Sequence, residues 1–130
     1  MQRVDPLTGV ASREHLLDRL DVVLARKAHD PTPVGVLLVD LDGFAALNGR
    51  SGHEVGDEVL VDVATRIDRT IRTGDVVGRW DDDAFLVVFA SAISPAEATV
   101  VAERILAEVR SVPSAPGLTA SIGLAFASRA

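Results

Sequence analysis

Five aspartates in two short stretches are the residues of this sequence best placed to do chemistry. Three are consecutive, Asp81–Asp83, and stand between an Arg-Trp pair and an apolar run. Asp40 and Asp42 end another apolar run, and their spacing would project both side chains from the same face of a strand. Clustered carboxylates at strand ends suit Mg²⁺, a hard cation that prefers oxygen ligands. Asp-x-Asp alone is a weak signal, and a solvated acidic turn in an acidic chain explains the same pattern.

Composition limits the classes of function. The 130 residues suffice for one domain, whose core must be aliphatic because aromatic residues are scarce, with one Trp, four Phe and no Tyr. The net charge of −6 disfavours nonspecific binding to nucleic acids or to anionic membranes. No apolar run approaches the roughly 20 residues that cross a bilayer. With no cysteine in the chain, we expect a cytoplasmic domain that itself contacts neither DNA, RNA nor membrane, in a parent protein that could still be membrane-anchored.

Hydrophobic periodicity predicts the elements that position these residues. Helical spacing recurs in four segments, which are 12–28, 43–48, 54–70 and a stretch that opens at Ser94-Pro95 and ends before Pro113. Strand patterns also occur in four segments, which are 34–39, 76–80, 84–89 and 118–126. The second and third of these strands bracket Asp81–Asp83 and predict a β-hairpin. The order indicates an α+β sandwich with an antiparallel hairpin in its sheet, and argues against a doubly wound nucleotide-binding sheet.

Several motifs in the right order connect the chain to a known family. They are Asp5-Pro-Leu-Thr-Gly-Val-Ala-Ser-Arg13, Asp40-Leu-Asp-Gly-Phe44, Gly52-His-Glu-Val-Gly-Asp57 and Thr119-Ala-Ser-Ile-Gly123. With them the chain resembles, over nearly its whole length, the GGDEF family of diguanylate cyclase domains. The resemblance implies a nucleotidyl-cyclase, palm-like sandwich, with helices packed over a central antiparallel sheet of about five strands. It also implies that residues 1–130 are a single GGDEF domain from a larger multidomain signalling protein.

In the register of that family, the signature Gly-Gly-Asp/Glu-Glu-Phe turn is degenerate here. Asp81 and Asp82 replace the glycines, Ala84 replaces the glutamate, and Asp83 would be the surviving catalytic carboxylate. The glycines let the turn backbone approach a triphosphate, whereas the aspartates add bulk and negative charge. At ~5 Å and an effective dielectric of about 20, each repulsion is on the order of 3 kcal/mol before screening. Ala45 replaces a phosphate-contacting lysine, so we expect diguanylate cyclase activity to be lost.

Other parts of the family's site survive in the sequence. The resemblance implies weak Mg²⁺ binding by Asp40, the Leu41 carbonyl and Asp83, and guanine recognition by Asn48 and Asp57. Taken without the resemblance, Asn48 would be a helix C-cap and Asp57 a solvated residue of an acidic helix.

A second site implied by the resemblance is the inhibitory site, at which the product cyclic di-GMP binds. Arg72-Thr-Gly-Asp75 matches its Arg-x-x-Asp motif, and Arg104 matches a further arginine on the next helix. Guanidinium groups suit this ligand because they bond phosphates and guanine edges bidentately. The alternative is ordinary polar capping at a helix end.

Three hypotheses follow for the function. The first is a degenerate GGDEF domain that acts as a regulatory module in cyclic di-GMP signalling, binding cyclic di-GMP or, weakly, GTP. The second is a ligand-free scaffold for dimerisation or protein contact, and the third is a diguanylate cyclase that tolerates its altered turn. A homodimer is compatible with each, since the family's activity needs two domains face to face.

Overall fold

The computed structural model describes residues 3–27 and 33–127, which form four helices and four strands. Their order along the chain is α1 (Arg13–Lys27), β1 (Val34–Leu41), α2 (Phe44–Ser51), α3 (His53–Thr70), β2 (Val76–Asp81), β3 (Ala84–Val88), α4 (Pro95–Arg110) and β4 (Ala120–Ala127). Every helix and strand predicted from the sequence is present, with boundaries shifted by a few residues. Within the described residues no helix is long and apolar enough to cross a membrane.

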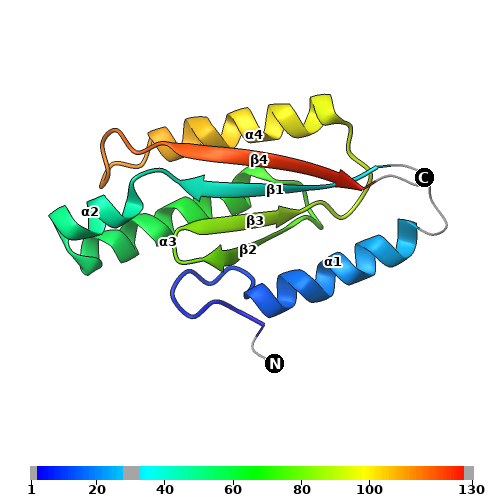
Figure 1. The fold of residues 1–130 in the computed structure, drawn as a ribbon, viewed down its shortest axis with the longest axis horizontal. Coiled ribbons are helices and arrows are strands. Elements are labelled where there is room, and N and C mark those ends of the chain that lie inside the picture. Colours follow the sequence, from blue (N-terminus) through cyan, green and yellow to red (C-terminus); the bar gives the residue numbers. More distant parts are fainter. Residues whose placement is uncertain (1–2, 28–32, 128–130) are drawn as a thin grey trace.

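The strands form one antiparallel sheet in the order β2-β3-β1-β4 (Figure 1). β1 lies in the middle and pairs with β3 on one side and with β4 on the other, as its near-continuous apolar sequence predicts. The α+β sandwich with an antiparallel sheet is therefore confirmed. The described residues form four strands, one for each strand pattern in the sequence, whereas the resemblance implied about five.

Helices cover both faces of the sheet, and each face has its own core (Figure 1). Alternate residues of β1, among them Leu37 and Val39, pack with Ile67 of α3 and Ile105 of α4 on one face. On the other face, Leu16 of α1 belongs to a smaller cluster with residues of β3. Period-two alternation in the strands and one-sided apolar helices account for this two-faced packing.

Local sequence signals fix where two of the helices begin. Ser12 accepts a hydrogen bond from the backbone N–H of His15 (3.1 Å) and caps α1. Ser94 forms a capping box with Glu97, each side chain accepting from the other residue's N–H at 3.1 Å, and Pro95 is the first residue of α4.

Gly78 lets α1 and the N-terminal segment lie directly on β2. A Cβ at this position would lie 2.5 Å from Leu16 Cγ and 2.8 Å from the carbonyl oxygen of Ala11. This close approach explains a glycine in the middle of a strand. It places residues 3–11 beside the β2–β3 hairpin, where the acidic residues lie.

Candidate functional site

The fold brings the two acidic stretches together, as the sequence predicts. Asp40, near the end of β1, pairs in register with Ala84 of β3, and the Leu41 N–H donates to the Asp83 carbonyl oxygen at 3.0 Å. Burial, followed by the charges of Asp83, Asp42 and Asp81, raises the pKa of Asp40. The carboxylates are therefore close enough to repel one another across the strand end and the turn.

Asp42, unlike Asp40, uses its carboxylate in hydrogen bonds, although the spacing of the two residues predicts the same role for both. Its carboxylate accepts hydrogen bonds from the hydroxyls of Thr119 (2.9 Å) and Ser121 (2.8 Å), which tie the end of β1 to β4. Among the residues that the structure describes, no three His, Cys, Asp or Glu side chains are arranged to hold a metal ion.

Arg79 holds the acidic turn in place, a role that the motif comparison did not reveal. Its guanidinium donates to the carbonyl oxygens of Asp81 (3.0 Å) and Asp82 (2.6 Å), and contacts the Asp5 carboxylate at 3.4 Å. No non-glycine residue among those described has a positive φ, so the aspartates adopt this turn without backbone strain. The signal was present in the sequence, since Asp5 and Arg79 each belong to a stretch that resembles the family.

Asp5 anchors the other end of this link. Its carboxylate also accepts from the Thr8 N–H (3.0 Å) and the Thr8 hydroxyl (2.7 Å). Burial by itself would raise the pKa of Asp5, but the Thr8 hydrogen bonds and the charge of Arg79 together lower it. The N-terminal segment and the acidic turn are thus joined through one half-buried ion pair.

We expect Asp5→Asn to lower the free energy of unfolding by about 1–2 kcal/mol at neutral pH, because the charge-assisted contacts are lost. A lowered pKa means that the ionised carboxylate stabilises the fold above its ordinary pKa of 3.8. That contribution disappears as the pH falls through the lowered value, so wild type and variant should converge in acid. Urea titrations at several pH values measure this difference.

Asp18→Asn is the matched control for that measurement. Asp18 forms an ion pair with Arg3 at 2.9 Å, but both side chains are more than half exposed. Its replacement should cost less than about 0.5 kcal/mol. If Asp18→Asn lowered the free energy of unfolding as much as Asp5→Asn does, the contact between Asp5 and Arg79 would contribute no more to stability than an exposed ion pair.

A cavity of about 380 Å³ lies between the acidic turn and α2, lined by Phe44, Ala45, Asn48, Asp81, Asp82 and Asp83. Four of the predicted site residues, Asn48 and the three aspartates, therefore meet at one place. Asp57 does not line this cavity and is exposed near the start of α3. The α2 side of the cavity combines the apolar side chains of Phe44 and Ala45 with the amide of Asn48, and the turn side is anionic.

Asn48 has an unusual environment beside this cavity. Its Oδ1 is buried without a hydrogen-bond partner, and a Cβ at Gly56 would coincide with that atom. The expectation that Asn48 is a helix C-cap is wrong, because α2 continues to Ser51 and its C-cap is Gly52, whose N–H donates to the carbonyl oxygen of Asn48 at 2.9 Å. The Asn48 Oδ1 atom therefore lies against Gly56, shut off from solvent and without a hydrogen-bond partner.

The Arg-x-x-Asp motif has a structural role in this chain. The Asp75 side chain is 1% exposed, and its carboxylate accepts from the Arg72 N–H and Nε (both 3.1 Å) and from the Ala90 N–H (2.9 Å). The Arg72 side chain is 41% exposed and its guanidinium lies 5.4 Å from the centre of the Phe89 ring. The capping alternative thus describes Asp75, whereas Arg72 keeps donors that face solvent.

Two further arginines bear on this motif. Arg26, which the sequence comparison missed, donates to the Ala90 carbonyl oxygen at 3.4 Å, so Arg26 and the Arg72–Asp75 pair converge on one backbone residue. Arg104 is exposed on α4 and forms no hydrogen bond or ion pair with the described part of the chain. The structure shows no contact between Arg104 and Arg72.

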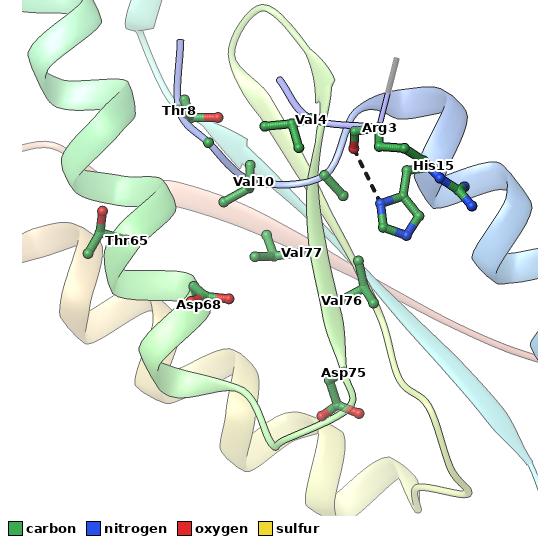
Figure 2. Close-up of a pocket in the computed structure, with 12 residues that line it drawn as sticks. Arg3, Val4, Thr8, Val10, His15, Thr65, Asp68, Asp75, Val76 and Val77 are labelled. Atoms are coloured by element: carbon green, nitrogen blue, oxygen red, sulfur yellow. Dashed lines mark hydrogen bonds between the residues drawn. The ribbon is translucent and has the colours of Figure 1, made fainter. Parts of the chain in front are cut away.

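A separate cavity of about 390 Å³ lies between the N-terminal segment, α3 and β2 (Figure 2). Asp75 is the only predicted site residue on its wall, and its carboxylate is already engaged. His15 faces the Arg3 carbonyl oxygen at 3.3 Å, while Val76 and Val77 border the middle of the hollow. Asn48 and the three aspartates of the turn, by contrast, line the cavity beside α2.

Comparisons with known proteins agree with this geometry. Residues 2–130 match the family model described as diguanylate cyclase, GGDEF domain. The bifunctional diguanylate cyclase/cyclic di-GMP phosphodiesterase MucR of Pseudomonas aeruginosa is 37% identical over 105 residues, which are 81% of this chain and 15% of MucR. The chain spans less than a third of the length of the curated relatives it matches.

Solved structures give the same result. Diguanylate cyclase SiaD of P. aeruginosa, in complex with its activator SiaC, superposes with a TM-score of 0.89 at 32% identity, over 95% of this chain and 49% of SiaD. The GGDEF domain of DgcB from Caulobacter crescentus, in complex with c-di-GMP, gives a TM-score of 0.88 at 26% identity, over 98% of this chain and 79% of that one. The chain belongs to the GGDEF family of diguanylate cyclase domains.

Proposed function

We propose that this domain is catalytically inactive and acts as a regulatory module in cyclic di-GMP signalling. The observation that carries the proposal is the cavity beside α2, whose turn side consists of Asp81, Asp82 and Asp83. Arg79, the cation attached to that turn, is engaged with backbone carbonyls and Asp5. A triphosphate entering the cavity would meet negative charge without a compensating donor.

Residual binding of Mg²⁺ and GTP is part of the proposal. Asp40, the Leu41 carbonyl and Asp83 would hold the ion, which would supply positive charge to a bound phosphate; two carboxylates make the site weak. By the family resemblance Asn48 and Asp57 would recognise guanine; Asn48 lines the cavity, and its side chain would have to turn away from Gly56 before Oδ1 could accept from a ring N–H. Such a domain would meet these ligands in the cytoplasm, which suits its cysteine-free sequence.

Cyclic di-GMP is the second ligand we propose, bound by Arg72 and Arg104 with Arg26 nearby. The DgcB domain, whose structure contains c-di-GMP, shares this fold over 98% of the chain. The Asp75 carboxylate already accepts hydrogen bonds from Arg72 and from the Ala90 N–H. Its role in such a site would therefore be to position Arg72. Positively charged side chains at the surface suit the two phosphates of the ligand.

Calorimetric titration of cyclic di-GMP into the wild-type domain tests this site, beside Arg72→Ala and the control Arg110→Ala. Arg110 is an exposed arginine in the last turn of α4, so its loss removes one charge without touching the motif. We expect micromolar binding that only Arg72→Ala abolishes. Binding that survives Arg72→Ala would exclude the proposed site, and an absence of heat would favour the scaffold hypothesis.

Incubation with GTP and Mg²⁺ tests catalytic inactivity. The assay uses both this domain and a longer protein that contains it, because the curated relatives extend well beyond the matched region. We expect no cyclic di-GMP after prolonged incubation. Product formation that stops on Asp83→Asn would instead identify an active diguanylate cyclase with an altered turn.

A further inference from the structure

The cavity between the N-terminal segment, α3 and β2 has no role in the proposed function (Figure 2). Its volume of about 390 Å³ lies in the range of small-molecule pockets. Asp68 of α3 lies on one side of the hollow and His15 of α1 on the other, with Val76 and Val77 of β2 between them. An apolar floor therefore separates two polar side chains that come from different helices.

Backbone hydrogen bonds fix the wall that the N-terminal segment contributes. Val4 and Ala11 form an antiparallel bridge, and the Ser12 N–H donates to the Arg3 carbonyl oxygen at 2.9 Å. Ala11 joins this segment to β2, because its N–H donates to the Val77 carbonyl oxygen at 3.1 Å. A ligand that enters between such walls has little of the chain left to order, which favours binding.

The two hydroxyl groups on the cavity wall have already used their hydrogens. The Thr8 hydroxyl donates to the Asp5 carboxylate at 2.7 Å, and the Thr65 hydroxyl donates to the Val61 carbonyl oxygen at 2.9 Å. Each oxygen keeps its lone pairs. Toward a ligand, both hydroxyls are therefore acceptors.

The His15 ring also offers an acceptor. Its Nδ1 lies 3.3 Å from the Arg3 carbonyl oxygen. Because a carbonyl oxygen can only accept, Nδ1 carries the hydrogen, and Nε2 of the neutral ring keeps a lone pair. The imidazole thus has the same hydrogen-bonding character toward a ligand as the two hydroxyls.

Asp68 adds an uncompensated negative charge to these acceptors. Its carboxylate is exposed and forms no hydrogen bond or ion pair with the described residues. The cation at the rim, Arg3, pairs with Asp18 at 2.9 Å, and its guanidinium lies beyond His15 in Figure 2. Asp75 also borders the cavity, but its carboxylate is already engaged. The side chains around the apolar floor therefore call for a ligand that is cationic and rich in donors.

We propose that this cavity binds an aliphatic diamine or polyamine. An ammonium group has three N–H donors and no acceptor, so it matches the Asp68 carboxylate. The methylene chain would lie on Val76 and Val77, and a second amine would donate to Nε2 of His15. The net charge of −6 attracts such a cation, whereas a metal ion would find one free carboxylate, too few for a cage of oxygen ligands. The inference is independent of the proposed function, because no residue of this site lines the cavity beside α2.

Calorimetric titration of spermidine into the domain tests the site, beside Asp68→Asn and the control Glu58→Gln. Glu58 is an exposed residue of α3 outside the cavity wall, so the control removes the same charge from the same helix. We expect wild type and Glu58→Gln to bind alike, and Asp68→Asn to raise the Kd about tenfold. Equal weakening in both variants would mean nonspecific attraction to an acidic chain and would overturn the proposal, as would an absence of binding to wild type.

Thr65→Lys supplies a competing ammonium from the protein itself. Thr65 is exposed and lies one helical turn before Asp68, so the new side chain can pair with that carboxylate without disturbing the core. We expect it to raise the Kd for spermidine at least as much as Asp68→Asn does. An unchanged affinity would show that spermidine does not use this carboxylate.

Amide chemical shifts locate the ligand in the wild-type protein. Spermidine should shift the amides of 8–11, 65–68 and 76–77. Shifts centred on Asp81–Asp83 would overturn the proposal, because the acidic turn would then be the cation site. The same titration of a longer protein that contains this domain should give the same affinity. Loss of binding there would overturn the proposal too, since another part of the protein would then occupy the cavity.

Discussion

Asp75→Ala is expected to lower the free energy of unfolding by about 2–3 kcal/mol, because it removes a buried carboxylate that accepts three charge-assisted hydrogen bonds. The carboxylate is 1% exposed and accepts from the backbone N–H groups of Arg72 and Ala90 as well as from the Arg72 side chain. These bonds connect the end of α3 to the residues that follow β3. Thermal and urea unfolding of the two proteins at neutral pH measure the loss.

Arg72→Ala is the matched comparison, since it removes the other partner of the same ion pair. The Arg72 side chain is 41% exposed, and Asp75 would keep both backbone donors. We therefore expect a cost below about 1 kcal/mol. If the two substitutions cost the same, the ion pair would matter and the backbone contacts of Asp75 would not.

These two variants separate stability from recognition in one four-residue motif. Arg72→Ala should abolish ligand binding while leaving the fold intact, whereas Asp75→Ala should weaken the fold first. Both residues match the motif equally well in the sequence. Only the structure shows that one carboxylate is buried against backbone donors while its arginine partner reaches solvent.

The fold was largely predictable because each element carries a strong local pattern. The apolar run of β1, the one-sided helices and the caps at Ser12 and Ser94 all act over a few residues. The strand order and the faces covered by each helix depend on packing between distant segments. Gly78 illustrates this, because nothing in its neighbours along the chain predicts that Leu16 and Ala11 lie against it.

The sequence predicted which residues gather at the candidate site better than it predicted the contacts that each of them makes. The approach of Asp83 to the end of β1 follows from the hairpin, and the structure confirms it. Asp42 has the same spacing signal as Asp40, but the hydroxyls of Thr119 and Ser121, nearly 80 positions away, engage it. Contacts at such separations are set by the register of β1 and β4.

Asp81→Gly/Asp82→Gly is expected to raise the affinity for GTP in the presence of Mg²⁺ about 25-fold, the largest gain in affinity that we predict. Each removed charge relieves about 1 kcal/mol of repulsion after screening, which is roughly fivefold in affinity. The Arg79 bonds to the turn go to backbone carbonyls, so they survive the substitution. Two glycines should lower stability by about 1–2 kcal/mol, partly offset by less repulsion on Asp40.

Asp81→Asn/Asp82→Asn separates charge from bulk in the same experiment, because it removes both charges and keeps both side chains. Titration with a non-hydrolysable GTP analogue should show most of the gain in the asparagine variant if charge is the main obstacle. A gain confined to the glycine variant would mean that the Cβ atoms keep the phosphates away. An unchanged affinity in both would place the defect elsewhere in the cavity, at Ala45 on its α2 side.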